Sequence, residues 1–338
     1  LKKNGVKINP NDPEIEKQLF EKAELNDRLV TLLADFLGIY KEGQFKKDEM
    51  IESVSKIKSD ERERYKDYLI LFYDVFDRYQ NYLNKRQEVD FADLLKLGTE
   101  KLKKKQFKAK FKRIIVDEYQ DISRGRYRFL KAIIDNQTDC RIMCVGDDWQ
   151  SIYAFNGSDI KYTFDFDKIF GKTARVDLDK SFRFSQPILD VSSRFIQRNP
   201  FQLKKEITSR PSKIKKAIEI INLDYGEENS LLNIFEAINS IRPKNTKWNV
   251  YLLGRYKRIA KKNNIFPEVP KEIKSKFKSL NFEFMTIHKS KGLGADAIIV
   301  LNLDAGKYGF PGYIENDPIM NLVRPGEQDF KNAEERRV

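Results

Sequence analysis

Two short apolar runs in the middle of the chain each end in acidic residues. The first, Ile114 to Val116, precedes Asp117 and Glu118; the second, Ile142 to Val145, precedes Gly146 and two aspartates. A run of apolar residues without polar alternation is typical of a strand that is buried on both faces of a sheet. Ligands of open α/β sheets bind outside the carboxyl ends of such strands. The pattern therefore predicts two strands that present carboxylates to a ligand.

The first hundred residues show a helical period instead. Apolar side chains in residues 61–83 recur at intervals of three and four, which predicts an amphipathic helix with one buried stripe. We expect this stripe in the core, because aromatic stripes are far more often core than base-stacking surfaces. Asp90 and Asp93 have the spacing of a helix cap and predict the start of the next helix. The stripe consists of Tyr65, Leu69, Phe72, Phe76, Tyr79 and Leu83.

The second half of the chain alternates short apolar segments with helical ones. The predicted strands cover residues 174–178, 217–223, 249–253, 283–287 and 297–303.

Composition narrows the class of protein. Apolar residues make up 40% of the 338 residues, enough for cores in two or three folded units. The sequence has no run of 18 apolar residues and no apolar export segment in its first ten residues, so we expect a cytoplasmic protein without a membrane partner. Cys140 and Cys144 would lie about 13 Å apart on one strand, too far for a disulfide. With a single histidine they cannot form a structural zinc site unaided.

The charge balance favours polyanionic partners. Lys and Arg number 64 against 51 Asp and Glu, a net charge of +13. Residues 101–113 hold eight basic residues in thirteen, and 203–216 and 255–278 are also basic. Such runs are more often solvated faces than contacts, so charge alone does not establish a nucleic-acid site.

The two acid-tipped segments resemble motifs II and III of the UvrD-like superfamily 1 helicases. They read DEYQD at 117–121 and VGDDWQSIYAFNGSD at 145–159. LDKSFRF at 178–184 and SSRFIQRNPFQLKK at 192–205 are most similar to the helicase IV branch of this family, and the resemblance extends over residues 90–338. It implies an α/β fold of RecA-like P-loop motor domains, with domain 1A partial, domain 2A mostly present, and a helical 1B-like segment.

The resemblance divides the chain into three regions. Residues 1–108 resemble the helical 1B segment and its return into domain 1A. Residues 109–175 resemble the second half of domain 1A, with motifs II and III. Residues 176–338 resemble domain 2A, with motifs IV and V and the start of motif VI.

The glycine-rich phosphate loop of these enzymes does not occur upstream of Asp117. The GKT at 171–173 has Phe166 where that loop needs its first glycine, and no apolar strand precedes it. NAEERRV at 332–338 resembles only the beginning of motif VI. We therefore expect an internal part of a longer protein that does not hydrolyse ATP by itself.

The resemblance also assigns the nucleotide site. Asp117 would hold Mg²⁺ and Glu118 would accept a proton from the attacking water; as adjacent strand residues they would point to opposite sides. Gln150 would sense the γ-phosphate, and Arg183 would reach it from domain 2A with a bidentate guanidinium. Gly294 stands where the family usually has a glutamate that contacts the ribose. Further nucleotide-site residues implied are Gln120, Asp121, Asp147, Gly292 and Gly294.

A DNA site is implied beside it. Tyr153 and Phe155 would project to one side of an extended stretch and stack on unpaired bases, although for Tyr153 a core position is equally open. Asn156 stands where many relatives have an arginine. The turn after the strand at 283–287 would hold the DNA backbone. Its contacts would be Thr286, His288, Lys289 and Lys291.

The resemblance as a whole implies an ATP-dependent DNA helicase of the DNA repair type. ATP hydrolysis with Mg²⁺ would drive 3′ to 5′ movement along single-stranded DNA and unwinding of partly duplex DNA; protein partners are unknown. A non-catalytic module that binds nucleic acid is one alternative, which a phosphate loop encoded upstream would reject. A helicase-like factor that binds RNA polymerase is another, and a polymerase pull-down would discriminate it.

Overall fold

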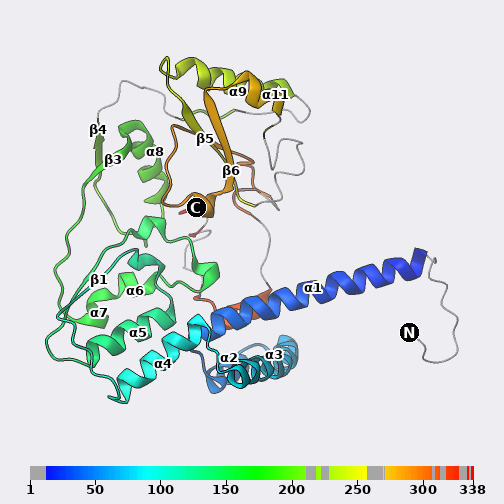
Figure 1. Cartoon of the computed structure of the whole chain (residues 1–338), viewed down its shortest axis with the longest axis vertical. Helices are drawn as coiled ribbons and strands as arrows, with labels where there is room; N and C mark the ends of the chain where they lie inside the picture. Colours follow the sequence, from blue (N-terminus) through cyan, green and yellow to red (C-terminus); the bar gives the residue numbers. More distant parts are fainter. Residues whose placement is uncertain are drawn as a thin grey trace.

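The structure is a computed structural model that describes residues 13–210, 218–221, 228–256, 269, 271–306, 309–312, 317–326, 333–334 and 336–338. Helices dominate the first hundred residues, and strands alternate with helices after them (Figure 1). Mixed α/β architecture is therefore confirmed. No helix within the described ranges combines the length and the apolar character needed to span a bilayer.

The elements have the following bounds. The helices are α1 (Pro13–Glu42), α2 (Lys47–Ser55), α3 (Ser59–Arg86), α4 (Phe91–Lys103), α5 (Arg124–Asp135), α6 (Lys161–Phe164), α7 (Phe166–Phe170), α8 (Gln186–Ile196), α9 (Glu228–Ile241), α11 (Lys271–Lys276) and α12 (Ile287–Ser290). The strands are β1 (Arg113–Val116), β2 (Arg141–Cys144), β3 (Lys180–Ser185), β4 (Thr208–Arg210), β5 (Trp248–Gly254), β6 (Leu280–Thr286) and β7 (Ala297–Val300). Short 3₁₀ helices are η1 (Tyr119–Asp121), η2 (Asp148–Gln150), η3 (Ala154–Asn156) and η4 (Pro318–Leu322).

An aromatic core joins α1, α2 and α3. The predicted stripe on α3 faces this core, with Tyr65, Leu69, Phe72 and Leu83 all buried. Phe36 of α1 and Phe72 are fully buried, with ring centroids 4.6 Å apart in an edge-to-face arrangement. The aromatic stripe is thus a packing surface, as expected.

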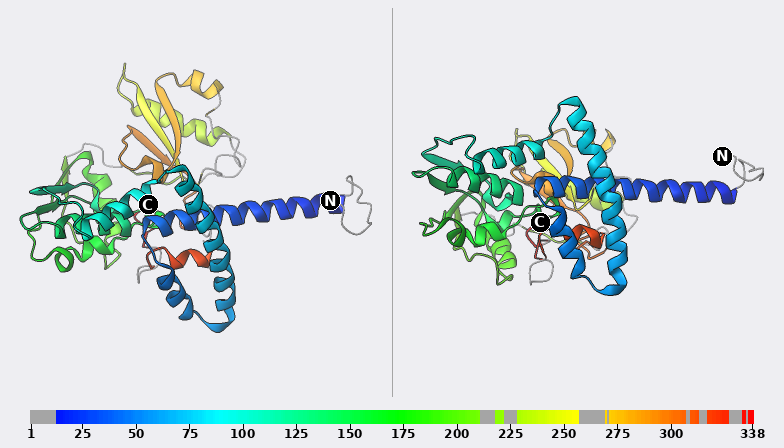
Figure 2. Two further views of the ribbon diagram at one scale, coloured as in Figure 1. Left: turned by 60° about the horizontal axis from the view of Figure 1, so that its bottom comes forward. Right: turned by 90° about the horizontal axis from the view of Figure 1, so that it is seen from below.

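The end of the chain returns to this helical core. Ile319, Met320 and Val323, in and after η4, are buried in the same cluster as the side chains of α1 and α3. Asp317 accepts a hydrogen bond from Arg64 at 2.7 Å. Figure 2 shows η4, in red-orange, lying beside α1 and α3. A segment that follows the last strand in sequence therefore stabilises the first helices.

The first sheet pairs β1 with β2 in parallel, and α5 crosses between them. Both strands were predicted, but the prediction that they are buried on both faces is wrong. Ile115 and Met143 are 72% and 60% exposed, whereas their neighbours on the other face pack against α5. Nothing in the described part of the chain covers the outer face. Cys144 lies on the inner face, where burial raises the pKa of its thiol to about 12, and both cysteines are free thiols.

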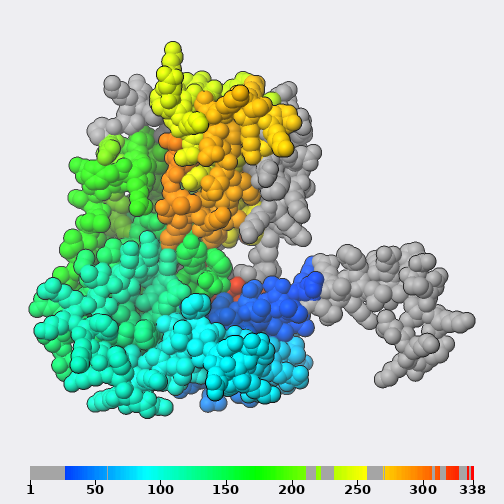
Figure 3. All heavy atoms as spheres, in the orientation of Figure 1, coloured from blue at the N-terminus to red at the C-terminus, as the bar shows by residue number. Residues whose placement is uncertain are grey.

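The second half of the chain forms a pair of strands, β3 with β4, and a sheet of order β6-β5-β7, all parallel. Three predicted strands are confirmed as β5, β6 and β7. The strand predicted at 174–178 is wrong, because this segment is extended without a pairing partner and the strand forms at β3 instead. Of the strand predicted at 217–223, residues 218–221 form no strand and the others lie outside the described residues. Figure 3 shows this half, in yellow and orange, above the helical part.

A buried ion cluster fastens α1 to α4. Asp90 caps α4 in the predicted capping box with Asp93. The Lys41 ammonium, 6% exposed, donates hydrogen bonds to Asp90 Oδ2 at 2.6 Å and to Asp93 Oδ2 at 3.0 Å. Burial alone raises the pKa of Asp90, but hydrogen bonds from Lys41 and from the Asp93 backbone lower it overall. The cluster therefore stabilises the fold at neutral pH and loses that contribution as the pH falls through the lowered pKa.

Replacing Lys41 tests this cluster. Lys41→Met should lower the free energy of unfolding by about 3 kcal/mol, because two partly buried carboxylates lose their cation. Lys56→Met is the control: it removes an exposed i,i+4 pair with Glu52 and should cost no more than about 0.5 kcal/mol. Urea titrations of both variants measure the difference. Equal losses would mean that water solvates the Lys41 cluster.

Candidate functional site

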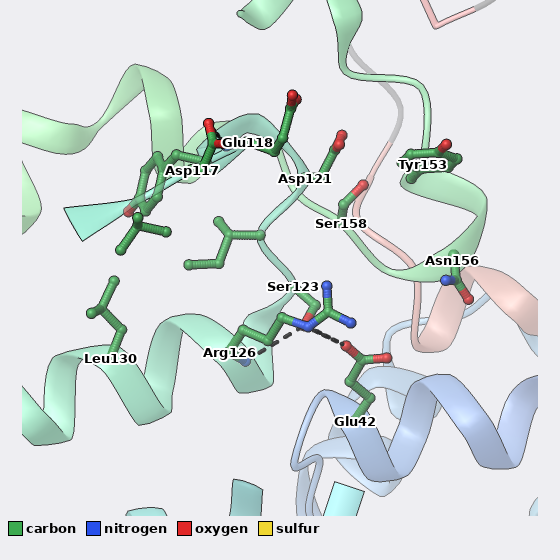
Figure 4. Close-up of a pocket in the computed structure, with 13 residues that line it drawn as sticks. Glu42, Asp117, Glu118, Asp121, Ser123, Arg126, Leu130, Tyr153, Asn156 and Ser158 are labelled. Carbon is green, nitrogen blue, oxygen red and sulfur yellow. Dashed lines mark hydrogen bonds and ion pairs between the residues drawn. The ribbon is translucent and has the colours of Figure 1, made fainter. Parts of the chain in front are cut away.

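The carboxylates that follow β1 gather at one side of a cavity of about 480 Å³. Glu118 has a left-handed backbone, with φ 49° and ψ 42°, and η1 follows it. The prediction that Asp117 and Glu118 point to opposite sides is therefore wrong: this turn directs Asp117, Glu118 and Asp121 to the same side (Figure 4). Non-glycine residues in this conformation are often held there at functional sites.

Gln120 connects the ends of the two strands. Its side chain is fully buried; Nε2 donates to Glu118 Oε2 at 2.6 Å, and Oε1 accepts the Asp147 backbone N–H at 2.9 Å. A Cβ at position 146 would lie 2.7 Å from Gln120 Oε1, which explains the glycine before Asp147. The Gln120 amide thus fixes Glu118 relative to the loop after β2.

Asp147 in turn holds Gln150. Gln150 Nε2 donates to Asp147 Oδ2 at 2.6 Å, and the other carboxylate oxygen accepts the Trp149 backbone N–H at 3.1 Å. Gln150 is otherwise exposed. Its amide therefore lies at the same strand edge as the motif II carboxylates, in a fixed orientation.

Asp117 meets the simplest requirement of a magnesium ligand. One oxygen, Oδ1, accepts the Glu118 backbone N–H at 2.9 Å, and the side chain is exposed. Mg²⁺ in phosphoryl-transfer sites is usually bound by one or two carboxylates together with substrate phosphates.

Lys291 crosses from the turn after β6 to these carboxylates. Its side chain, 11% exposed, forms an ion pair with Asp121, lies 3.9 Å from Glu118 Oε2, and donates to the Gln150 carbonyl at 2.8 Å. Burial raises the pKa of Asp121, and the hydrogen bond from Lys291 opposes this. We expected Lys291 among the DNA contacts; in the structure its ammonium group lies beside the carboxylates that follow β1.

An aromatic cluster lies next to Lys291. The predicted extended stretch is wrong, since η3 forms there, but the Tyr153 and Phe155 rings still lie 6.0 Å apart. Phe155 is 46% exposed, and its ring meets that of His288 edge-to-face at 5.3 Å. Tyr153 is more buried and donates to the His288 carbonyl at 3.2 Å. Phe155 is therefore the more accessible of the two rings.

Thr286 and Lys289 form the rest of this turn. The Thr286 hydroxyl accepts the Lys289 backbone N–H at 3.4 Å and caps α12, and the Lys289 side chain is exposed. Arg183 on β3 is also exposed, and its side chain makes no ion pair in the described part of the chain. Gly292 and Gly294 face open space, since no described atom lies within 4 Å of the point that a Cβ would occupy on either residue. The structure thus gathers the motif II, III and V residues but not Arg183.

Sequence reasoning missed a second basic contact. Lys205, 15% exposed, pairs with Asp147 Oδ1 at 2.6 Å and with the fully buried Asp148, and lies 5.0 Å from the Trp149 ring centroid. The Trp149 indole N–H donates to the Leu203 carbonyl at 3.0 Å. The only sequence signal was the lysine pair at the end of the 192–205 segment.

The last described residues also reach the loop after β2. Glu334 accepts the Ala154 backbone N–H at 3.0 Å, and Arg337 Nε donates to the Ser151 carbonyl at 2.6 Å. Burial lowers the pKa of Arg337. In the sequence, these residues were recognisable only as the start of motif VI, and their contacts with the loop after β2 were not predicted.

The sequence is similar to those of known DNA helicases. The family model of the UvrD/REP helicase N-terminal domain matches residues 4–171. The chain is 31% identical over 323 residues to DNA helicase IV of Escherichia coli (strain K12), covering 96% of this chain and 45% of that protein. It is 30% identical over 212 residues to the ATP-dependent DNA helicase Rep of Buchnera aphidicola subsp. Acyrthosiphon pisum (strain APS), covering 60% and 32%.

A third relative is ATP-dependent DNA helicase UvrD1 of Mycobacterium tuberculosis (strain ATCC 25618 / H37Rv), 30% identical over 143 residues, or 39% of this chain and 18% of that protein. The chain therefore spans less than half the length of these relatives. The carboxylate edge, the Gln120 bridge and the Phe155 ring all lie within the residues that the family model matches. On these grounds the chain belongs to the family of UvrD-like helicases.

Proposed function

We propose that this chain is the part of an ATP-dependent DNA helicase in which the nucleotide site and the DNA site are joined. The observation that carries this proposal is Lys291. It contacts Asp121 and the Gln150 backbone on the nucleotide side, and it lies 4.9 Å from the Tyr153 ring centroid on the aromatic side. A movement of the carboxylate side or of the aromatic side therefore changes the contacts that Lys291 makes with the other side.

The roles at the nucleotide site follow from the side chains. Asp117 is the ligand for Mg²⁺, which when bound neutralises charge on the phosphates. Glu118 accepts the proton of the attacking water, and Gln120 holds the Glu118 carboxylate at 2.6 Å. Gln150, held by Asp147, detects the γ-phosphate. Arg183 would reach the γ-phosphate only after the two halves of the protein move toward each other.

At the DNA site, Phe155 stacks on an unpaired base, and Thr286 and Lys289 contact the backbone. His288 supports the Phe155 ring. We propose 3′ to 5′ movement along single-stranded DNA with unwinding of partly duplex DNA.

We also propose a division into three domains: a 1B-like domain over residues 1–108, domain 1A over 109–175 and domain 2A over 176–338. In this division η4, which belongs to the third domain, packs on the first.

A polypeptide of these 338 residues tests the DNA site without ATP. It should bind single-stranded oligonucleotides at low salt, and the observed binding constant should fall as salt rises. It should not turn over ATP, because its sequence has no phosphate loop to hold the β- and γ-phosphates. Phe155→Ala should weaken binding by about 1 to 3 kcal/mol in fluorescence anisotropy. Phe91→Ala, at an 88% exposed ring on α4, is the control.

Two results would contradict the assignment of Phe155. Equal affinity of the Phe155→Ala and Phe91→Ala variants would exclude stacking. A loss of about 3 to 5 kcal/mol in folding stability would show that Phe155 is a core residue.

The role of Glu118 requires a longer protein that also contains a phosphate loop. Glu118→Gln should still bind ATP but lose about 10²- to 10⁴-fold in DNA-stimulated hydrolysis, because the amide cannot accept the proton. Glu100→Gln, an exposed acid on α4, is the control. Steady-state ATPase assays measure both, and near-wild-type turnover of Glu118→Gln would assign the base elsewhere.

We further propose that Lys205 positions Asp147 and hence Gln150. Lys205→Met should expose Trp149 and lower the free energy of unfolding by about 3 kcal/mol, since the buried Asp148 loses its cation. Tryptophan emission in a Trp248→Phe background, which leaves Trp149 as the single tryptophan, should shift to the red. Lys205→Arg should restore it in part, and the exposed neighbour Lys204→Met should change nothing. Identical spectra for Lys205→Met and Lys204→Met would reject this role.

A further inference from the structure

A basic surface lies at the opposite end of β1 from the Asp117 and Glu118 carboxylates. It consists of residues 101–113, from the end of α4 to β1, together with Arg141 on β2; we call it the amino-edge patch. Strand β1 has four residues, so the patch begins roughly 13 Å from Asp117. In Figure 3 this segment, in cyan to blue-green, lies at the lower outer edge of the molecule. None of the roles proposed above uses it.

The cations of the patch are exposed and unpaired. The side chains concerned all face solvent, and no ion pair joins any of them to a carboxylate within the described ranges. The nearest acids in sequence, Glu100 and Asp139, are exposed and likewise form none. The cations are Lys101, Lys103, Lys104, Lys105, Lys108, Lys110, Lys112, Arg113 and Arg141.

Two of these cations belong to neighbouring strands. Arg113 and Arg141 occupy the same register position on the paired strands β1 and β2. Neighbouring strands lie about 4.8 Å apart, and like charges directly opposite each other are destabilising. An anion bound between the two guanidinium groups would remove this repulsion.

The backbone of the patch is fixed rather than loosely attached. The Ala109 N–H donates to Asn136 Oδ1, and the Phe111 N–H donates to Gln137 Oε1, both at 2.8 Å. Ala109 and Leu102 are buried against α4 and α5. Because Leu102 and Ala109 are buried and two backbone N–H groups are bonded, little ordering of the backbone is needed when a ligand binds.

Two aromatic rings interrupt the lysines. Phe107 and Phe111 are 57% and 53% exposed. Exposed aromatic rings within a cationic track are the means by which proteins bind single strands, because every base can stack on a ring while lysines contact phosphates. A duplex has no unpaired base for these rings, and an anionic lipid surface needs no such alternation.

From these observations we propose that the amino-edge patch is a second binding site for single-stranded nucleic acid, separate from the Phe155 site. It binds the phosphates through its lysines and two arginines, and Phe107 and Phe111 stack on bases. This site stands on its own contacts and does not depend on the assignment of the nucleotide site.

The test uses the 338-residue chain with Phe155→Ala, so that the first site is weakened. In that background, Phe107→Ala with Phe111→Ala should weaken binding of a fluorescent oligothymidine about tenfold or more. Lys108→Gln with Lys110→Gln should reduce the slope of the logarithm of the binding constant against log salt by about 1.4, or about 0.7 for each phosphate contact. Lys56→Gln with Lys66→Gln, an equal loss of charge on exposed side chains just after α2 and on α3, should change neither.

The possible outcomes separate the explanations. Unchanged binding in both patch variants would overturn the proposal. A loss in the lysine variant alone, with equal binding of duplex DNA or of anionic vesicles, would reduce the patch to a general polyanion surface and also overturn it. If the aromatic variant fails to fold by circular dichroism, the lysine variant and its salt slope decide. Patch-dependent binding together with unchanged affinity of the Phe155→Ala chain relative to the unsubstituted chain would instead contradict the first site only.

Discussion

The candidate site depends on one buried amide. Gln120 donates to Glu118 and accepts from the backbone of Asp147, so it fixes the ends of β1 and β2 relative to each other at the edge where the carboxylates lie. Without that amide, the Asp147 N–H would lose its partner, at a cost of about 1 to 3 kcal/mol. The orientations of Glu118 and, through Asp147, of Gln150 follow from it. A single side chain thus relates the proposed base to the proposed sensor.

Three distant segments of the chain converge on the loop after β2. Lys205 binds its aspartates, Lys291 reaches the Gln150 carbonyl, and Arg337 reaches the Ser151 carbonyl. All three are cations directed at carboxylate or carbonyl oxygens. Charged hydrogen bonds of this kind are stronger than neutral ones, and their partial burial reduces screening. The loop therefore responds to the position of the second half of the protein as a whole.

The proposed coupling has a physical basis in this convergence. Lys291 has contacts on both the carboxylate and the aromatic side, so its ion pair with Asp121 and its position over Tyr153 cannot change independently. The amino-edge patch, in contrast, has no described contact with this network and lies at the other end of β1. Nucleic acid bound there would be held without disturbing the nucleotide site.

The sequence by itself determined the local elements and the chemistry of the strand ends. The α3 stripe, the Asp90 cap, β1, β2 and the carboxylates after β1 follow from short-range periodicity and residue type, which a linear pattern records. The prediction from sequence failed where the formation of an element depends on a partner distant in sequence. The strand expected at 174–178 had no neighbour to pair with, whereas β3 pairs with β4. By sequence alone, Lys205 and Lys291 are indistinguishable from ordinary surface lysines or DNA contacts. Folding placed Lys205 beside the buried Asp148 and Lys291 beside the partly buried Asp121. Only the tertiary structure decided these contacts, because ion pairs between residues far apart in sequence depend on the packing of whole elements.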